Sequence, residues 1–174
     1  AAIVCNDDPK VKKIISEINN KHIITYGFTE GSDLQATSMR YDGDFINFDI
    51  KISIKNYEKK ILNNIKIPLA GKHNVLNALA AIVVACKLNI DVSKIVSALK
   101  NFKGIERRLT RVGEWKEILI IDDYAHHPTE IKSTLEALKD SLKPNRIIAI
   151  FQPHRYSRVK DLFKEFLDSF EMAD

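Results

Sequence analysis

The chain has 174 residues, of which 45% are hydrophobic and 29% are charged, and its formal net charge is +4. This length is enough for one or two domains with a hydrophobic core, and the composition is typical of a soluble globular protein. The lysines are spread along amphipathic segments rather than clustered with aromatic residues, which argues against nucleic-acid binding. No apolar run is long enough to span a bilayer. We therefore expect no membrane association and a cytoplasmic location.

The start of the chain and the two cysteines indicate a reduced protein that continues upstream. The first residues, AAIVC, are apolar, lack the basic region of a signal peptide and do not include an initiator Met, so we expect the natural chain to begin earlier. Cys5 and Cys86 lie far apart in apolar surroundings. They predict buried reduced thiols rather than a disulfide or a cysteine metal site. The sequence predicts no oligomeric state.

The first 27 residues predict a β-α-β unit, the repeat of an α/β sheet. Residues 2–5 and 22–26 are short apolar runs typical of buried parallel strands. Between them, Asp8 and Pro9 suit the N-cap and the first position of a helix, and Asn19-Asn20 would end it. The apolar residues of this helix recur at helical spacing, at Val11, Ile14, Ile15 and Ile18.

The middle of the chain predicts an antiparallel β appendage to that sheet. Residues 34–39 and 45–54 alternate between apolar and polar side chains, and the Asp42-Gly43 pair between them is a strong hairpin signal. Residues 56–64 are polar and predict a turn. Residues 65–69 predict one more short strand.

Two helices and a charged joint follow. A helix is expected from His73 to about Leu88, and Asp91 suits the N-cap of a second helix. Residues 103–108, KGIERR, form a charged joint that is the best candidate for a domain boundary, and we expect a hinge at or near Gly104. The second helix is expected to extend to Phe102 and to bury Ile95, Val96, Leu99 and Phe102.

The rest of the chain predicts the order β-β-α-β-α. Residues 109–112 and 118–121 would form a hairpin around a Gly113-Glu114 turn. A helix would run from Pro128 to near Leu142, and a core strand and an amphipathic helix would follow at residues 146–151 and 161–172. These elements open a second α/β domain, and so small a sheet buries little, so we expect this domain to be truncated as well.

Two polar motifs precede the second domain. A glycine leads into a helix whose first turns carry His73, Asn74 and Asn77. Amide side chains offer both a donor and an acceptor, which suits an adenine edge, while simple helix capping is the structural alternative. Arg107 and Arg108 suit phosphate recognition, with a solvated pair at a linker as the alternative. Because neighbouring side chains point apart, we expect only one of the two arginines to function.

Two further polar motifs follow expected strands of the second domain. Residues 122–127, DDYAHH, follow one strand, and residues 152–158, QPHRYSR, follow another. Ligands of α/β sheets bind at the carboxyl ends of strands, and a right-handed crossover would bring both loops to one edge, so we expect a single site. Arg155 and Arg158 suit an anion such as a carboxylate, and Ser157 suits a helix N-cap. Metal ligation is the rival interpretation, although the spacing matches no structural zinc pattern.

Four strings in this order and at this spacing resemble the Mur ligases: GKHNVLNA, RR, DDYAHHPTE and FQPHRYSR. The similarity is strong from about residue 65 to residue 174. It implies an α/β fold in which residues 1–106 form the C-terminal portion of a central P-loop-type ATPase domain with an antiparallel β appendage. Residues 107–174 would form the N-terminal portion of a Rossmann-like C-terminal domain. The HHP and QPHR strings resemble family members that join L-alanine to UDP-N-acetylmuramate in peptidoglycan synthesis.

The resemblance implies an ATP-dependent ligase. A substrate carboxylate would attack the γ-phosphate of ATP to give an acyl phosphate, an amine would displace phosphate, and Mg²⁺ would neutralise charge. Arg155 would bind the alanine carboxylate, and His126 is a candidate general base because imidazole titrates near neutrality. The nucleotide side would consist of His73, Asn74, Asn77, Arg108 with Arg107 as second choice, and Asp123. The amino-acid side would consist of Tyr124, His126, His154, Arg155 and Arg158.

The chain also departs from the family pattern. It contains no Gly-Lys-Thr/Ser phosphate loop, so we expect the triphosphate cradle and the Mg²⁺ ligands upstream and this piece to be inactive alone. Ala125 stands where many relatives carry glycine, which matters only if that residue needs a positive φ. Two alternatives are a sister ligase that adds a recycled peptide and a catalytically dead binding module on the same fold. A third is a metal hydrolase that uses Asp122, Asp123, His126, His127 and His154.

Overall fold

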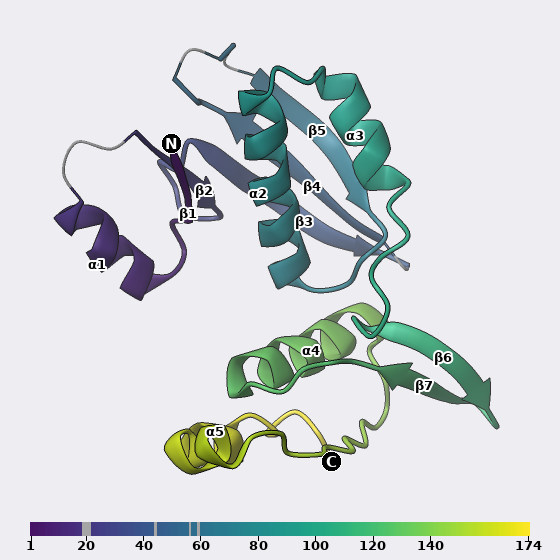
Figure 1. Ribbon diagram of the computed structural model, residues 1–174. Coiled ribbons are helices and arrows are strands. Elements are labelled where there is room, and N and C mark those ends of the chain that lie inside the picture. The colour runs from purple at the N-terminus through teal and green to yellow at the C-terminus, as the bar shows by residue number, and fades with distance from the viewer. Residues whose placement is uncertain (19–21, 44, 56, 59) are drawn as a thin grey trace. The chain divides into compact units, whose positions relative to one another are not determined.

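The computed structural model describes residues 1–174 except 19–21, 44, 56 and 59. The chain divides into two compact units (Figure 1). Unit 1 consists of residues 1–68 and 73–102, and unit 2 of residues 69–72 and 103–174. The expected helix end at Asn19-Asn20 lies outside the described residues.

Unit 1 is built on a mixed five-stranded sheet with the order β1-β2-β3-β4-β5. β1 and β2 pair in parallel, and so do β2 and β3, whereas β4 pairs antiparallel with both β3 and β5. The predicted β-α-β unit and the predicted hairpin are therefore both confirmed. The strands are β1 (Ala2–Cys5), β2 (Ile23–Gly27), β3 (Leu34–Asp42), β4 (Phe45–Ile52) and β5 (Lys60–Ile67).

Helix α1 (Pro9–Glu17) begins as predicted. The Asp8 side chain accepts hydrogen bonds from the N–H groups of Lys10, at 2.7 Å, and Val11, at 3.0 Å, and Pro9 occupies the first helical position. None of the residues of α1 is fully buried, and Ile14 is exposed. The apolar face that predicted this helix is therefore only partly covered within unit 1.

The loops after β1 and β2 are joined through one carboxylate. Asp7 accepts hydrogen bonds from the N–H of Phe28, at 2.9 Å, and from the N–H and the hydroxyl of Thr29, at 2.9 and 2.8 Å. Gly27 lies directly beneath this group, because a Cβ atom at residue 27 would stand 2.3 Å from Asp7 Oδ1. Only glycine leaves room for the carboxylate at this place.

Strand β5 begins earlier than predicted, so the expected turn over residues 56–64 is wrong from Lys60 onward. Lys60 pairs with Ile52 of β4, and the pairing continues to Ile67 with one register shift. At the shift, Asn64 takes a positive φ of 57° and donates its N–H to Asp49 Oδ1 at 2.8 Å. The sequence of β5 does not alternate, because Ile61 is 65% exposed and Asn63 and Asn64 are both exposed beside the register shift.

Helix α2 (Lys72–Lys87) lies across one face of this sheet (Figure 1). It contributes Val75, Leu79, Val83 and Cys86 to a core whose other large members are sheet residues. Burial of these apolar groups is the main contribution to the stability of the unit. The sheet residues are Ile24, Leu34, Ile46, Phe48, Ile50, Ile52, Ile65 and Ile67.

Helix α3 (Val92–Lys100) is capped as predicted, because Asp91 accepts the N–H of Ser93 at 2.8 Å. Of its expected apolar face, Ile95 is buried, whereas Val96 and Leu99 are half-buried. The prediction that Phe102 is buried is wrong: it is 42% exposed because the helix ends before it. Both cysteines are free, Cys86 buried and Cys5 partly buried.

Unit 2 opens with the predicted hairpin, formed by β6 (Thr110–Trp115) and β7 (Ile118–Asp122). The predicted Gly113-Glu114 turn is wrong. The strands are joined at Lys116-Glu117, whose φ angles are 47° and 67°, and Gly113 lies within β6 beside a register shift. Glycine signals a bulge as well as a turn, and here the strand uses it for the bulge.

The predicted strand at residues 146–151 is absent, and the predicted helix at 161–172 is broken. The segment pairs with neither β6 nor β7, and Ile148 and Ile150 are 66% and 98% exposed. Ile147 and Phe151 instead pack against a cluster of Ile131, Leu135 and Phe166. An apolar run becomes a strand only when another strand satisfies its backbone groups. The C-terminal helices are α5 (Tyr156–Asp161) and α6 (Phe163–Asp168), with Leu162 between them.

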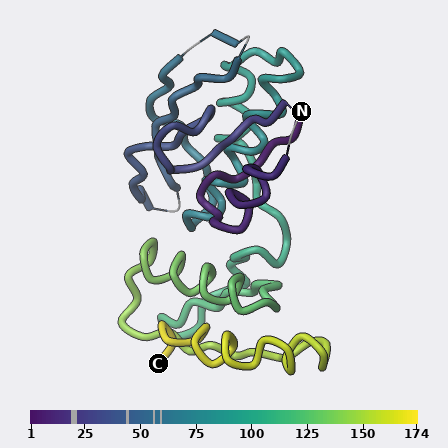
Figure 2. The backbone as a smooth tube through the Cα atoms, turned by 90° about the vertical axis from the view of Figure 1, so that its left-hand side faces the viewer, coloured from purple at the N-terminus to yellow at the C-terminus, as the bar shows by residue number. Residues whose placement is uncertain are grey.

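Helix α4 (Pro128–Leu142) matches its prediction, and α6 packs beside it. Figure 2 shows the C-terminal segment, in yellow, running along α4. The predicted N-cap at Ser157 is wrong, because α5 begins at Tyr156 with Arg155 as its N-cap residue. Within the described ranges, no helix combines the length and the hydropathy that a membrane span requires.

Candidate functional site

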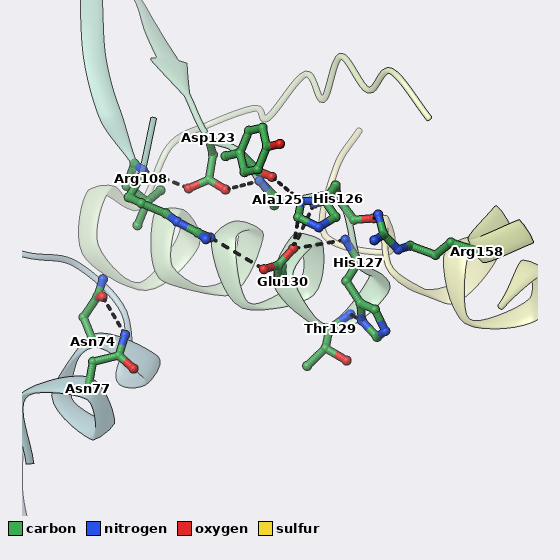
Figure 3. Close-up of polar contacts among 12 residues, drawn as sticks. Asn74, Asn77, Arg108, Asp123, Ala125, His126, His127, Thr129, Glu130 and Arg158 are labelled. Atoms are coloured by element: carbon green, nitrogen blue, oxygen red, sulfur yellow. Dashed lines mark hydrogen bonds and ion pairs between the residues drawn. The ribbon is translucent and has the colours of Figure 1, made fainter. Parts of the chain in front are cut away.

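The joint and the loop after β7 are held together by backbone contacts of Asp123. Its two carboxylate oxygens accept the N–H of Leu109, at 2.8 Å, and the N–H of Ala125, at 2.7 Å (Figure 3). The N–H of Tyr124 donates to the carbonyl of Arg107 at 2.8 Å. Arg107 and Leu109 take positive φ angles of 58° and 50°, so this path is unusual for side-chain-bearing residues. The polar loop is thereby fixed against the joint.

The side chains of Arg107 and Arg108 go to different partners, as adjacent side chains were expected to do. Arg107 Nε lies 3.4 Å from Asp122 Oδ2, and its guanidinium lies over the Tyr124 ring at 4.7 Å. Arg108 Nη1 lies 3.6 Å from Glu130 Oε1. Both arginines are exposed, so each can still reach an anionic ligand.

Glu130 is the centre of the polar contacts at the start of α4. Its Oε2 atom accepts the N–H of His126 at 3.0 Å and the N–H of His127 at 3.1 Å. His127 is the N-cap residue, and its Nδ1 atom accepts the N–H of Thr129 at 3.3 Å, which completes a capping box. The polar loop therefore enters α4 in a fixed direction.

Charges around Glu130 keep its side chain ionised. Burial by itself raises the pKa of the Glu130 carboxyl. The hydrogen bonds from the His126 and His127 amides, together with the charges of His126 and Arg108, outweigh burial and lower the pKa below its usual value. At neutral pH this group is a carboxylate that only accepts hydrogen bonds.

The imidazole of His126 has two neighbouring acceptors. Its Nδ1 atom lies 2.9 Å from the carbonyl oxygen of Tyr124 and 3.5 Å from Glu130 Oε2. The ring also meets the Tyr124 ring edge to face, with 5.1 Å between centroids. The orientation of the ring is thus fixed from three sides.

The expected meeting of the two polar loops occurs through Arg158. Its Nη1 atom donates to the carbonyl oxygens of His126 and His154, each at 3.4 Å. Arg155 lies between His154 and Arg158 in sequence, with an exposed side chain and a positive φ of 69°. The loops after β7 and after residue 151 are therefore neighbours in unit 2, although the second follows no strand.

The candidate residues of the first polar motif, from His73 onward, lie in unit 1, whereas Gly71 and Lys72 before them belong to unit 2. Gly71, with a φ of 97°, precedes α2, and Asn77 donates an amide hydrogen to Asn74 Oδ1 at 3.4 Å. The two amides share one helix face, as their spacing predicts. His73, Asn74 and Asn77 thus lie in unit 1, and the other candidate residues lie in unit 2.

Comparison with known proteins assigns both units to one family. The Mur ligase middle domain matches residues 1–85, and the Mur ligase glutamate ligase domain matches residues 107–174. The chain belongs to the Mur ligase family.

Several known proteins are similar to this Mur ligase chain in sequence and in fold. It is 43% identical to the UDP-N-acetylmuramate–L-alanine ligase of Bartonella tribocorum, over 99% of this chain and 36% of the relative. It is similar in structure to the UDP-N-acetylmuramate–alanine ligase of Thermotoga maritima, with 30% identity and a TM-score of 0.69, over 87% of this chain and 32% of the other. A murein peptide ligase from Psychrobacter arcticus also matches at 30% identity and a TM-score of 0.61, over 88% and 31%. The chain spans about a third of the length of the curated relatives it matches.

The sequence placed Glu130 at the start of a helix but did not predict that it lies at the centre of the polar contacts of the site. The signal was the capping-box spacing of Glu130 from His127, which fixes where the carboxylate points. Ala125 does not have a positive φ, so alanine fits at this place in the Mur ligase loop.

The groups proposed for a metal hydrolase have other partners. Asp122 contacts Arg107, Asp123 accepts two backbone hydrogen bonds, and His127 caps α4. Among the described residues, no three His, Cys, Asp or Glu side chains gather in a way that can hold a metal ion.

Proposed function

We propose that this chain is part of an ATP-dependent ligase that joins L-alanine to UDP-N-acetylmuramate in peptidoglycan precursor synthesis. The observation that carries the proposal is the 43% identity, over 99% of the chain, with a relative that bears this name. The geometry of unit 2 supports it, because the loops that carry the candidate amino-acid ligands lie together. Since ATP is a cytoplasmic substrate, we place the reaction in the cytoplasm.

The two halves of the chain are proposed to belong to different domains of the ligase. Residues 1–106 would be the late part of the central ATPase domain, and residues 107–174 the early part of the C-terminal domain. The separation of the units between Phe102 and Lys103 and the family match from residue 107 support a boundary in this joint.

On the nucleotide side, we propose that the Asn74–Asn77 pair reads the adenine together with His73. Arg108, or as second choice Arg107, would contact the phosphates, since both guanidinium groups are accessible. Asp123 would act mainly by holding the backbone of residues 107–109, because both of its oxygens already accept N–H groups. A ribose contact would use the remaining lone pairs of these oxygens.

On the amino-acid side, we propose that the exposed Arg155 binds the carboxylate of L-alanine as a charge-assisted pair. Tyr124, His126 and His154 would shape the rest of this site. Arg158 is engaged with the His126 and His154 carbonyls, so it would hold the two loops together and stand near the substrate.

The proposed reaction has two steps. An oxygen of the UDP-N-acetylmuramate carboxylate attacks the γ-phosphorus, and ADP leaves. The amine nitrogen of L-alanine then attacks the acyl carbon, inorganic phosphate leaves, and His126 takes a proton from the amine. Mg²⁺, whose ligands we expect upstream, would neutralise phosphate charge. Arg108 and Arg155 would orient the two reactants and require no proton transfer.

The nearest alternative is a ligase that adds a recycled peptide. The observation that favours this alternative is the structural similarity to the murein peptide ligase of Psychrobacter arcticus. The dense polar loop at residues 122–127, with its fixed imidazole, argues against a binding module without chemistry.

The test is phosphate release from ATP by the full-length protein with UDP-N-acetylmuramate, measured with L-alanine, with a tripeptide and with neither. We expect release that depends on L-alanine. Release only with the tripeptide would assign the recycling reaction, and no release under any condition would favour the binding module.

A further inference from the structure

Glu130 makes more contacts than the start of a helix requires. In a capping box the third helical residue accepts the N–H of the N-cap residue, as Glu130 does for His127 at 3.1 Å. The same oxygen also accepts the N–H of His126 at 3.0 Å, and the other oxygen faces Arg108 Nη1 at 3.6 Å. Neither of these two contacts serves the cap.

The Glu130 carboxylate also lies close to the imidazole of His126. Nδ1 of this ring lies 2.9 Å from the Tyr124 carbonyl and 3.5 Å from Glu130 Oε2. Both neighbours only accept, so both favour a hydrogen on Nδ1. In the neutral ring the lone pair that can take a proton is then on Nε2.

We propose that Glu130 is a positioning residue that holds Arg108 and His126 in a fixed relation and keeps the basic lone pair of His126 on Nε2. The inference rests on the proposed function, in which Arg108 contacts the nucleotide phosphates and His126 takes the amine proton. The Glu130 carboxylate then orients both Arg108, which acts on the nucleotide, and His126, which acts on the amine.

The exposure of these groups indicates where the effect of Glu130 will be seen. The side chains of Arg108 and Glu130 are 49% and 34% exposed. Ion pairs this accessible contribute little to stability. Loss of the negative charge should therefore change the kinetics of the ligase far more than its unfolding.

The decisive variant is Glu130→Gln in the full-length ligase. Glutamine serves in a capping box as glutamate does, so its carbonyl oxygen can still accept the two backbone N–H groups, but it carries no charge. We expect kcat/KM for L-alanine to fall about tenfold, because the candidate general base loses a group that orients it. The KM for ATP should rise, and the melting temperature should fall only slightly, because the amide oxygen accepts the two N–H groups less strongly than the carboxylate. Asp140→Asn, which removes an exposed charge of α4, is the matched control and should leave all three unchanged.

The kinetic result has a clear contrary outcome. If Glu130→Gln has a wild-type KM for ATP and a wild-type kcat/KM for L-alanine, Glu130 is only a cap and the proposal is overturned. A double variant adds a second check. In an Arg108→Ala background, Glu130→Gln should raise the KM for ATP less than it does alone, and equal effects would contradict the link to Arg108.

A spectroscopic measurement separates this proposal from the function on which it rests. Imidazole ¹⁵N spectra of the full-length protein need no substrate, and His126→Gln identifies the His126 signals. We expect the hydrogen on Nδ1 in the wild type and a shift toward Nε2 in Glu130→Gln. A hydrogen on Nε2 in both overturns the role of Glu130 even in an active ligase. The expected spectra without alanine-dependent phosphate release would overturn the proposed function instead.

Discussion

Arg155, like Arg107, is a candidate residue whose own backbone is strained. It takes a φ of 69° and forms the N-cap of α5 without a side-chain hydrogen bond to the helix. A positive φ of this kind costs a side-chain-bearing residue about 1–3 kcal/mol. Strain of this kind is often kept where a side chain must be presented to a ligand, which agrees with the role proposed for Arg155 at the alanine carboxylate.

Two replacements of Arg155 should have the same effect on the KM for L-alanine but different effects on stability. Arg155→Gly removes the guanidinium and relieves the backbone, so we expect the KM for L-alanine to rise at least tenfold while the free energy of unfolding increases by about 1 kcal/mol. Arg155→Ala should raise the KM equally without the gain in stability. Steady-state kinetics and thermal denaturation of the full-length protein measure both. An unchanged KM in either variant would show that another group binds the carboxylate.

Single residues were predictable where their effect is local. Asp8 and Asp91 cap their helices as expected, because an N-cap contact spans only two or three residues. Phe102 and the bridging role of Glu130 were missed. The exposure of Phe102 depends on where α3 ends, and the bridging role of Glu130 depends on contacts with residues distant in sequence. Spacing alone predicts neither of these.

At the level of elements, the sequence predicted strands and helices well when their pairing was local and less well otherwise. The β3–β4 hairpin and α4 carry their own turn and cap signals and were placed correctly. Residues 146–151 have the apolar pattern of a strand, but strand formation depends on a partner, and none of β1–β7 pairs with them. The candidate loops were nevertheless brought together as expected, because Arg158 supplies a contact that no strand provides.

The hairpin of unit 2 allows a test of turn position. Lys116 and Glu117 both have positive φ, the arrangement that a two-residue type I′ turn requires. Glu117→Gly should therefore raise the melting temperature slightly or leave it unchanged. Glu114→Gly should lower stability by about 0.5–1 kcal/mol, because Glu114 lies within β6 and pairs with Arg111. If thermal denaturation showed that Glu117→Gly is the less stable of the two variants, the turn would lie at Gly113-Glu114 instead.

At the scale of the whole molecule, one segment of the joint between the units is held by hydrogen bonds and another segment is held less firmly. Residues 107–109 are bound to the loop after β7 through Arg107 and Asp123. Gly104 takes a φ of 82°, a conformation in which glycine is unstrained. The tied residues should move with unit 2 in any change of domain arrangement.

We predict that rotation between the domains of the full-length ligase is confined to residues 102–106. Comparison of structures with and without substrates measures this directly, by the backbone angles that change. Gly104 should be among the residues whose angles change. A rotation centred beyond Leu109 would require the Asp123 contacts to break and would contradict the prediction.

The packing of Asp7 against Gly27 has an evolutionary consequence. The Asp7 carboxylate occupies the space in which a side chain at residue 27 would begin, and it holds the Phe28 and Thr29 amides from there. Residue 27 therefore cannot acquire a side chain while the acid at residue 7 stays in place. A lineage that acquires a side chain at residue 27 must first lose or shorten the acid at residue 7, and it must then find another acceptor for the two amides. The pair should be inherited together across the family.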